Sequence, residues 1–229
     1  METTSAPVQE RVITLPGASA SDRAYSWTRE RILDGTFAAG EMISEGEISG
    51  SVGVSRTPVR EAFLRLASEG ILELFPKRGA FVVPVTPAEM RDVIEARLLI
   101  EVWAAGVVAA CEDRAATVRR LADCIAEMNA ARLPDEALRY HEADRKFHET
   151  IVAATDNTHL AMFYRSLRDR QLRISLTLGS MNSRTERIHT EHQSILTAIA
   201  AGDAARAASL VRAHIGKNRD ALELKLRFG

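Results

Sequence analysis

Hydrophobic positions along the 229-residue chain change their spacing near residue 85, and this change predicts two domains. Before this point, short apolar stretches with helical spacing are followed by two stretches of strand character, whereas the helical period continues beyond it. We therefore expect a mainly α-helical protein with a small mixed domain at 21–85 and a helical domain at 86–229. Residues 1–20, which are rich in Ser, Thr, Ala, Pro and Gly, are expected to form a flexible tail.

The first domain has the pattern of a helix-turn-helix. Apolar residues at helical spacing predict a helix over 21–34, and Ser44 is a suitable N-cap for a short second helix. Gly53 supplies the tight turn to a third helix, which Ser55 or Thr57 would cap. Two strands follow, at 71–75 and 80–83, and the loop between them contains Pro, Lys, Arg and Gly. These elements predict a winged helix-turn-helix of three helices and a β-hairpin wing with a basic tip.

Basic residues gather where such a motif meets DNA. Arg56 and Arg60 project from the start of the third helix, and an arginine can contact a guanine at two atoms while hydroxyl groups hold phosphates. The alternative is a solvated helix face beside Glu61. Because the capped helix start, the glycine turn and the basic wing occur together, we favour DNA binding. The candidate contacts are Ser55, Arg56, Thr57, Arg60, Lys77, Arg78 and Gly79.

Composition narrows the remaining classes of function. The net charge of −1 gives no general attraction to nucleic acid, so binding must depend on this local arrangement. No basic segment followed by an apolar stretch opens the chain, and no apolar stretch is long enough to span a bilayer, so we expect a cytoplasmic protein without a membrane segment. Cys111 and Cys124 lie within helical apolar patterns and are interpreted as small buried hydrophobes.

The pattern of the second domain predicts a bundle of about six helices. Thr86, Pro87 and Glu89 form a capping-box start for a long helix that ends near Cys111. Ser183 begins a second capping box, and Gly202-Asp203 separates the last two helices. The other predicted helices cover 115–131, 134–155 and 158–178.

Four side chains of this domain form a candidate metal site. Asp144 and His148 are four residues apart, which places both on one helix face about 6 Å apart. His192 and His214 flank the Gly202 turn at similar distances, so they should lie at nearly equal heights on two antiparallel helices. Three imidazoles and one carboxylate suit zinc, nickel, cobalt or manganese.

His141 competes for a place in this site because it lies three residues before Asp144. It cannot join His148 on one ion, since about 10.5 Å of helix rise separates them. A histidine in a helix is more often a surface residue or a hydrogen-bonded core residue than a ligand. Spacing alone therefore leaves metal binding and an ordinary structural role about equally favoured.

The N-terminal segment resembles the winged helix of GntR-family bacterial regulators. The resemblance implies DNA contacts at Ser55, Arg56, Thr57 and Arg60, with Gly79 at the wing. Gly46 departs from the pattern, because some members place a base-contacting arginine there. The matching stretches are Ser44-Glu45-Gly46-Glu47-Ile48, Gly53-Val54-Ser55-Arg56-Thr57-Pro58-Val59-Arg60-Glu61-Ala62, Leu66, Glu69-Gly70 and Arg78-Gly79-Ala80-Phe81-Val82.

The C-terminal segment is similar to the ligand-binding domain of the FCD branch of that family. In metal-containing members the ligands fall on Asp144, His148, His192 and His214, which implies a bound metal, zinc first, with open positions for a small organic acid. Arg97 matches a pocket-facing arginine that could bind the acid, although a salt bridge to Glu101, four residues on, is the alternative. The matching stretches are Asp144-x-x-x-His148, Asn157, Glu191-His192-x-x-Ile195, Ala198-Ile199, Gly202-Asp203 and His214-Ile215.

Together these features predict a regulator, not an enzyme. We expect a homodimer that binds a palindromic double-stranded operator and responds to a small organic acid at the metal site. One alternative is a regulator whose metal is purely structural. The other is a metal-dependent hydrolase, against which stand the attached winged helix and the lack of a second acid or base at a suitable spacing.

Overall fold

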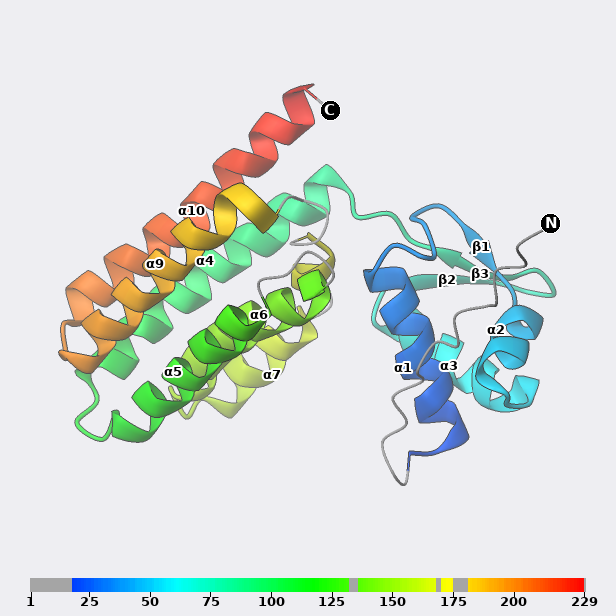
Figure 1. Cartoon of the computed structure of the whole chain (residues 1–229), viewed down its shortest axis with the longest axis horizontal. Helices are drawn as coiled ribbons and strands as arrows, with labels where there is room; N and C mark the ends of the chain where they lie inside the picture. The colour runs from blue at the N-terminus through cyan, green and yellow to red at the C-terminus, as the bar shows by residue number, and fades with distance from the viewer. Residues whose placement is uncertain (1–17, 132–135, 168–169, 175–180, 229) are drawn as a thin grey trace, which may run out of the picture. The chain divides into compact units, whose positions relative to one another are not determined.

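The computed structural model describes residues 18–131, 136–167, 170–174 and 181–228 (Figure 1). The chain divides into two compact units, the first ending at Val83 and the second beginning at Pro84, close to the boundary expected from the sequence. Most of the predicted tail at 1–20 lies outside the described residues. In the described parts of the chain, no helix combines the length and apolar character needed to cross a membrane.

The first unit is a helix-turn-helix followed by a hairpin that joins a small antiparallel sheet. The strand order is β1-β3-β2, and the hairpin register pairs Leu74 with Ala80. The predicted fold is confirmed, with one addition: β1 pairs with β3 through Ile43 and is too short to show a period in the sequence. The elements are α1 (Ala20–Leu33), β1 (Met42–Ile43), α2 (Glu45–Val52), α3 (Arg56–Ser68), β2 (Leu72–Phe75) and β3 (Gly79–Val82).

Local chemistry explains where α2 and α3 begin and end. The Ser44 hydroxyl accepts the backbone N–H of Glu47, whose carboxylate accepts the N–H of Ser44, so α2 starts in a full capping box. Gly53 ends α2 in the left-handed conformation, with φ at +71°. Ser55 is the N-cap residue of α3 but its side chain makes no capping hydrogen bond. The hydroxyl of Ser55 is therefore not consumed by the helix start.

Burial of one face of α3 leaves its other face exposed. Val59, Phe63 and Leu66 are buried in the core of the first unit. Arg56 and Arg60, in the first turns of the helix, flank this buried face and are exposed. The apolar spacing of α3 thus fixes which of its side chains can reach a partner.

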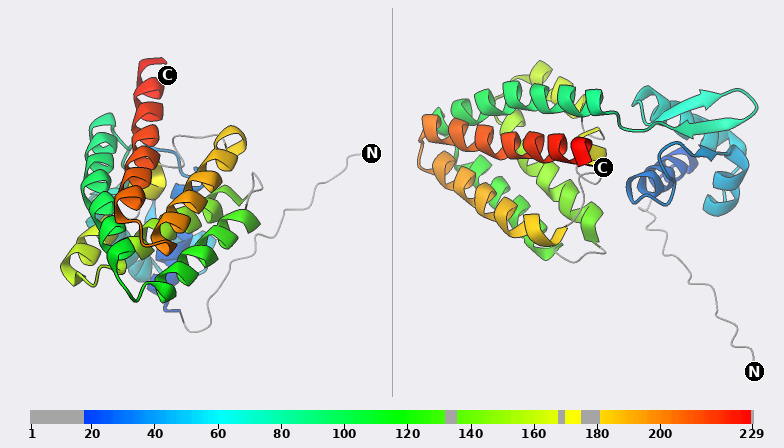
Figure 2. Two further views of the ribbon diagram at one scale, coloured as in Figure 1. Left: turned by 90° about the vertical axis from the view of Figure 1, so that its left-hand side faces the viewer. Right: turned by 90° about the horizontal axis from the view of Figure 1, so that it is seen from above.

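The second unit is a helical bundle, as predicted. In both views of Figure 2, α10 runs alongside α4, and α5 packs against α6. A turn at Gly202, with φ at +76°, connects α9 to α10, and the Asp203 carboxylate caps α10 by accepting the N–H of Arg206. The helices are α4 (Pro87–Ala110), α5 (Ala115–Ala130), α6 (Ala137–Ala153), α7 (Thr158–Ser166), α9 (Met181–Ala200) and α10 (Ala204–Phe228).

Three local predictions for this unit are wrong. The helix predicted over 158–178 is interrupted, because α7 ends at Ser166. Beyond it, the described residues 170–174 are helical. Helix α9 begins at Met181, so Ser183 lies inside it and is not an N-cap. Cys111 is exposed because it follows the last residue of α4, whereas Cys124 is buried as predicted. The predicted helix start at 134–135 lies outside the described residues.

Candidate DNA-binding face and metal centre

The start of α3 and the wing tip border one hollow in the first unit, with a volume of about 620 Å³. We call it the α3–wing hollow. Basic side chains from both elements reach it, and apolar groups form part of its wall. It is lined by Ser44, Glu45, Gly46, Arg56, Arg60, Phe63, Leu64, Leu74, Phe75, Pro76, Lys77, Arg78 and Gly79. Of the seven predicted DNA contacts, five line this hollow, while Ser55 and Thr57 are exposed at the start of α3.

Arg60 does not extend freely from α3. Its Nε donates to Glu45 Oε1 at 2.8 Å and its Nη2 donates to Glu45 Oε2 at 2.9 Å. These hydrogen bonds hold the pKa of Glu45 below its ordinary value. The sequence analysis missed Glu45, because nothing in the local pattern indicates that a residue of α2 faces α3 at this point.

Two backbone features shape the wing and the start of α2. Lys77 adopts a left-handed conformation, with φ at +64°, at the tip of the wing. Gly79 has φ at +111°, and a Cβ there would lie 2.2 Å from the carbonyl oxygen of Ile43, so only glycine fits beside β1. At Gly46 an added Cβ would lie 3.6 Å from Arg56 Nη2, which shows that Arg56 reaches over the start of α2.

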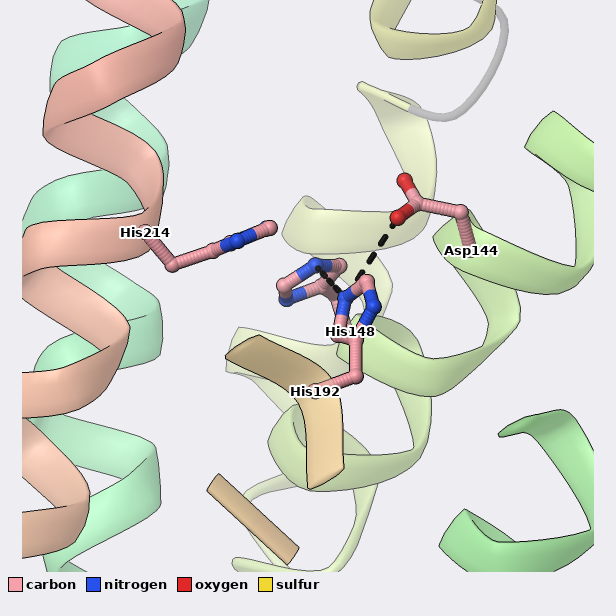
Figure 3. Close-up of side chains that lie close together, drawn as sticks. All are labelled: Asp144, His148, His192 and His214. Carbon is pink, nitrogen blue, oxygen red and sulfur yellow. Dashed lines mark hydrogen bonds and ion pairs between the residues drawn. The ribbon is translucent and has the colours of Figure 1, made fainter. Parts of the chain in front are cut away.

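The second unit brings together the four predicted metal ligands, Asp144, His148, His192 and His214 (Figure 3). We call them the histidine cluster. Their ligand atoms all lie within 4.8 Å of one another. His192 Nε2 lies 3.1 Å from His148 Nε2 and 3.4 Å from Asp144 Oδ1. The three histidines are buried, and the side chain of Asp144 is 16% exposed.

Two glutamates lie against the Nδ1 atoms of two of the three imidazoles, so that their Nε2 atoms face the cluster. His148 Nδ1 lies 2.6 Å from Glu101 Oε2, and His214 Nδ1 lies 2.7 Å from Glu191 Oε2. An ionised carboxylate can only accept a hydrogen bond, so the Nδ1 atom of His214 carries a proton, while Glu101 faces the Nδ1 atom of His148. Because burial lowers the pKa of His214, its ring is neutral and its Nε2 atom holds a lone pair. Carboxylates that orient histidines in this way are typical of metal sites.

The electrostatics of the cluster favour a cation. Burial alone would raise the pKa of Asp144, but the surrounding histidines and Arg97 outweigh it and lower the pKa to about 2. Burial lowers the pKa of His192 well below its ordinary value, and repulsion from His214 adds to this effect. At neutral pH the cluster thus presents one charged carboxylate and a neutral His192.

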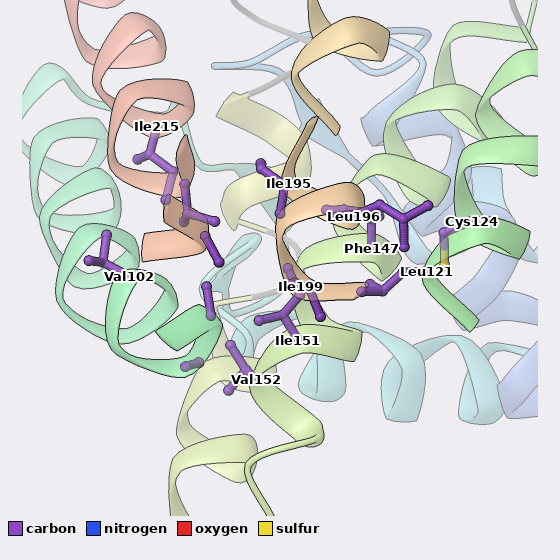
Figure 4. Packing of buried hydrophobic residues seen from close by; sticks show 14 of the residues in the cluster. Val102, Leu121, Cys124, Phe147, Ile151, Val152, Ile195, Leu196, Ile199 and Ile215 are labelled. Carbon is purple, nitrogen blue, oxygen red and sulfur yellow. The ribbon is translucent and has the colours of Figure 1, made fainter. Parts of the chain in front are cut away.

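Apolar side chains pack against the buried histidines of the cluster. The ring of Phe147 lies 4.5 Å from the ring of His192, measured between centroids. Figure 4 shows Phe147 among the buried side chains of the bundle, which also include Ile195 and Leu196 of α9. Such packing limits the movement of the imidazoles, so the ligands are held in place before any ion binds.

The donor set fits a transition-metal ion. Ligands at about 2.0–2.2 Å from one zinc ion lie no more than about 4.4 Å apart, so shifts of a few tenths of an ångström would suffice. The Nε2 atoms of His192 and His148 lie 3.1 Å apart, and the four ligand atoms converge on one point, all within 4.8 Å of one another. A cation at that point would satisfy lone pairs that otherwise oppose one another.

His141 and Arg97 are the two other side chains that the sequence associates with this site. His141 is not part of the group in the described chain, and its ring lies 5.4 Å from that of Tyr140. Arg97 is buried and donates through Nε to Glu101 Oε1 at 2.6 Å, which is the salt bridge considered as the alternative to a pocket-facing role. Tyr164 donates to the same oxygen of Glu101 at 2.5 Å.

Sequence reasoning predicted Glu101 only as a partner of Arg97, and it missed the supporting roles of Tyr164 and Glu191. Glu191 directly precedes a predicted ligand, and a carboxylate next to a ligating histidine was the one available signal. Glu191 is held by His214 and by Lys217, whose Nζ lies 2.7 Å from Glu191 Oε1. Burial would raise the pKa of Glu191, but these hydrogen bonds lower it to about 2.

Comparison with known proteins matches both units to families. Residues 20–82 match bacterial regulatory proteins of the gntR family, and residues 92–217 match the FCD domain. The HTH-type transcriptional regulator in the TAR-I ttuE-ttuC' intergenic region of Agrobacterium vitis is 32% identical over 142 residues, which cover 61% of this chain and 83% of that protein. The gluconate operon transcriptional repressor of Bacillus subtilis (strain 168) is 32% identical over 154 residues, 67% of this chain and 63% of the repressor.

Solved structures agree in fold. A GntR transcriptional regulator from Rhodococcus sp. RHA1 has a TM-score of 0.76 at 24% identity and covers 90% of this chain and 99% of its own. The E. coli protein McbR/YncC has a TM-score of 0.74 at 18% identity, covering 91% and 99%. The families and relatives are transcriptional regulators and not enzymes. The chain therefore belongs to the gntR family of bacterial regulatory proteins and is a DNA-binding transcriptional regulator that carries an FCD domain.

Proposed function

We propose that the chain is a homodimeric regulator whose affinity for a palindromic operator is controlled by a small organic acid bound at a metal ion in the second unit. The observation that carries this proposal is the histidine cluster, in which three buried imidazoles and one carboxylate converge within 4.8 Å. Glutamates lie against two of the three imidazoles, those of His148 and His214, and such support is expected of a metal site more than of a chance cluster of core histidines.

On the DNA side, α3 would enter the major groove and the wing would follow the backbone. Arg56 and Arg60 are the proposed base contacts, and Lys77 is a proposed phosphate contact. Arg56 and Arg60 line the α3–wing hollow from the helix and Lys77 lines it from the wing, which supports separate roles for the helix and the wing. The full proposed set is Ser55, Arg56, Thr57, Arg60, Lys77, Arg78 and Gly79.

The proposed metal ligands are Asp144, His148, His192 and His214, with zinc as the first candidate and nickel, cobalt or manganese as the others. When bound, such an ion would supply a Lewis acid that accepts an oxygen of the effector carboxylate at an open position. The residues of this chain hold the ligand atoms in place and bury the three imidazoles.

Arg97 would add attraction for the acid. Its charge contributes to the lowered pKa of Asp144, so its field reaches the cluster. Arg97 also shares Glu101 with His148, and Glu101 accepts a hydrogen bond from Tyr164. An acid that attracts Arg97 would therefore act on the same carboxylate that orients a metal ligand. This shared partner is a physical route by which effector binding favours one arrangement of α4, α6 and α7 over another.

An exposed apolar stripe on α4 supports the homodimer. Leu99, Trp103 and Val107 are spaced four residues apart, so they lie on one helix face, and they are 77%, 48% and 38% exposed. A second copy related by a two-fold axis would cover this stripe with the same stripe. Two copies would also present two recognition helices to the two half-sites of a palindrome. Light scattering should therefore give twice the chain mass of 25.2 kDa.

The test joins metal, acid and DNA in one measurement. Elemental analysis of the purified protein measures bound metal. Fluorescence anisotropy measures operator affinity in the presence of each member of a panel of small organic acids, both before and after a chelator removes the metal. Similarity to the gluconate operon repressor places gluconate in that panel. An acid should change the operator affinity of the metal-loaded protein only, and the operator should change the affinity for the acid by the same factor. If chelation lowers thermal stability while no acid alters DNA affinity, the ion is purely structural.

A further inference from the structure

Glu45 fixes the direction of Arg60 in the α3–wing hollow. One edge of the guanidinium, Nε and Nη2, meets the two oxygens of the Glu45 carboxylate at 2.8 and 2.9 Å. Glu45 is the first residue of α2 and Arg60 belongs to α3, so the pair joins the two helices of the motif. The Arg60 side chain is nevertheless 66% exposed. A long, flexible side chain is thus oriented while its far end remains accessible to a partner.

The contact with Glu45 leaves the guanidinium able to read a base. A guanidinium carries five N–H donors, and a two-point contact through Nε and Nη2 consumes two of them. The remaining N–H groups on Nη1 and Nη2 form a second edge, which matches the O6 and N7 atoms of guanine. Arg60 can therefore contact a guanine and keep Glu45 as its partner.

The same contact opposes the other common use of an arginine, which is binding a phosphate. A phosphate that approached Arg60 would also approach the Glu45 carboxylate, and two anions repel. The hydrogen bonds from Arg60 lower the pKa of Glu45, so this carboxylate is charged at neutral pH. A base edge carries no net charge and meets no such opposition. The Glu45 carboxylate therefore favours a contact between Arg60 and a base, which carries sequence information, over a contact with a phosphate, which does not.

We infer that Glu45 is a specificity-determining residue, which commits Arg60 to a base edge and keeps it away from the phosphate backbone. The inference rests on the proposed contact between Arg60 and the operator, and it adds the residue that directs this contact.

The experiment compares base preference and salt dependence in the full-length protein. Duplexes are selected from a randomised pool, and binding to the selected operator and to a scrambled duplex is then measured by fluorescence anisotropy over a range of salt. The variants are Glu45→Gln, Glu45→Asp and Arg60→Ala. Glu61→Gln is the matched control, because it removes the same charge from an exposed position of α3 that does not line the hollow. Melting curves verify that each variant is folded.

Glu45→Gln should bind the scrambled duplex more tightly, with a salt slope steeper by about 0.9 per protomer, because Arg60 gains a phosphate. The ratio of operator to scrambled affinity should fall about tenfold, close to the loss of one two-point base contact. One G·C position per half-site should lose its preference in both Glu45→Gln and Arg60→Ala. Glu45→Asp keeps the charge but shortens the side chain, so it should weaken the base preference without changing the salt slope.

Two different failures can be told apart. If the wild-type protein selects no motif from the pool, the proposed operator binding is wrong. If the wild type selects a motif and Arg60→Ala loses one position of it, while Glu45→Gln keeps the full preference, operator binding stands and the role of Glu45 is refuted. Equal effects of Glu45→Gln and Glu61→Gln would also refute it, since the charge alone would then explain the change.

Discussion

Two arginine–glutamate pairs of nearly the same length lie in opposite environments in this molecule. Arg60 and Glu45 are 2.8 Å apart, with side chains 66% and 24% exposed. Arg97 and Glu101 are 2.6 Å apart, with side chains 9% and 0% exposed. An exposed pair is screened by water and salt and contributes little to stability, whereas a buried pair leaves an uncompensated charge when one partner is lost. The same chemical pair is therefore suited to orient a side chain in one unit and to hold a site together in the other.

The surroundings of the two pairs extend this difference. Glu45 directs a single arginine toward an open hollow, where a DNA base can become its additional partner. Glu101 serves three partners at once, because it contacts Arg97, Tyr164 and His148 from inside the bundle. We infer that a change at the exposed pair stays local, while a change at the buried pair alters the proposed metal site as well.

The largest effect should follow from Glu101→Gln, which keeps the size of the side chain and removes its charge. The buried guanidinium of Arg97 would lose its counter-charge, so the free energy of unfolding should fall by about 3–5 kcal/mol. Loss of the carboxylate behind His148 should also reduce metal affinity by about 10- to 100-fold. Chemical denaturation and metal titration measure the two effects.

Glu45→Gln is the control for this comparison, since it makes the same substitution in the exposed pair. It should leave the unfolding midpoint and the metal content nearly unchanged. Equal losses of stability in the two variants would show that burial does not distinguish the pairs, and would remove the basis of the comparison.

The next largest effect concerns the metal ligands themselves. His192→Ala removes one of three imidazoles from the histidine cluster and should reduce metal affinity by more than about 100-fold, beyond the effect expected of an orienting residue. His141→Ala, on the same helix as Asp144 and His148 but outside the cluster, should keep its metal. Elemental analysis after gel filtration measures both. Full metal content in His192→Ala would contradict the proposed ligand set.

Helix geometry explains how much of this site the sequence could predict. Asp144 and His148 share a face because they are four residues apart on one helix, and the turn at Gly202 sets His192 opposite His214. Both predictions need only the rise and twist of a helix. The winged helix was equally predictable, because its caps, glycine turn and strand pattern are local features.

The residues that sequence reasoning missed depend on contacts between distant elements. Glu101 is predicted only as a local partner of Arg97, but its contact with His148 depends on how α4 packs against α6. Glu45 meets Arg60 only because α2 packs against α3. Neither the period of apolar positions nor the spacing of charges specifies such packing.

A smaller effect is expected from Arg56→Ala, the other proposed base contact. Loss of a two-point contact with a guanine should weaken operator binding about 10- to 100-fold and relax the preference at one position of each half-site. Binding to a scrambled duplex should change much less. Fluorescence anisotropy with operators altered one base pair at a time measures both quantities. A uniform loss across all duplexes would instead identify Arg56 as a phosphate contact.

The smallest effect should come from Lys77 at the wing tip, and it distinguishes charge from backbone conformation. Lys77→Ala and Lys77→Gly both remove the charge, so each should weaken all duplexes alike and reduce the salt slope by about 0.9 per protomer. Only glycine relieves the left-handed backbone, with φ at +64°, so Lys77→Gly should also raise the melting temperature of the first unit. Equal salt slopes in the two variants would show that the wing acts through its charge. A loss of affinity in Lys77→Gly alone would show that the wing acts through its rigidity, because the two variants differ only in how strongly the tip of the hairpin is restricted.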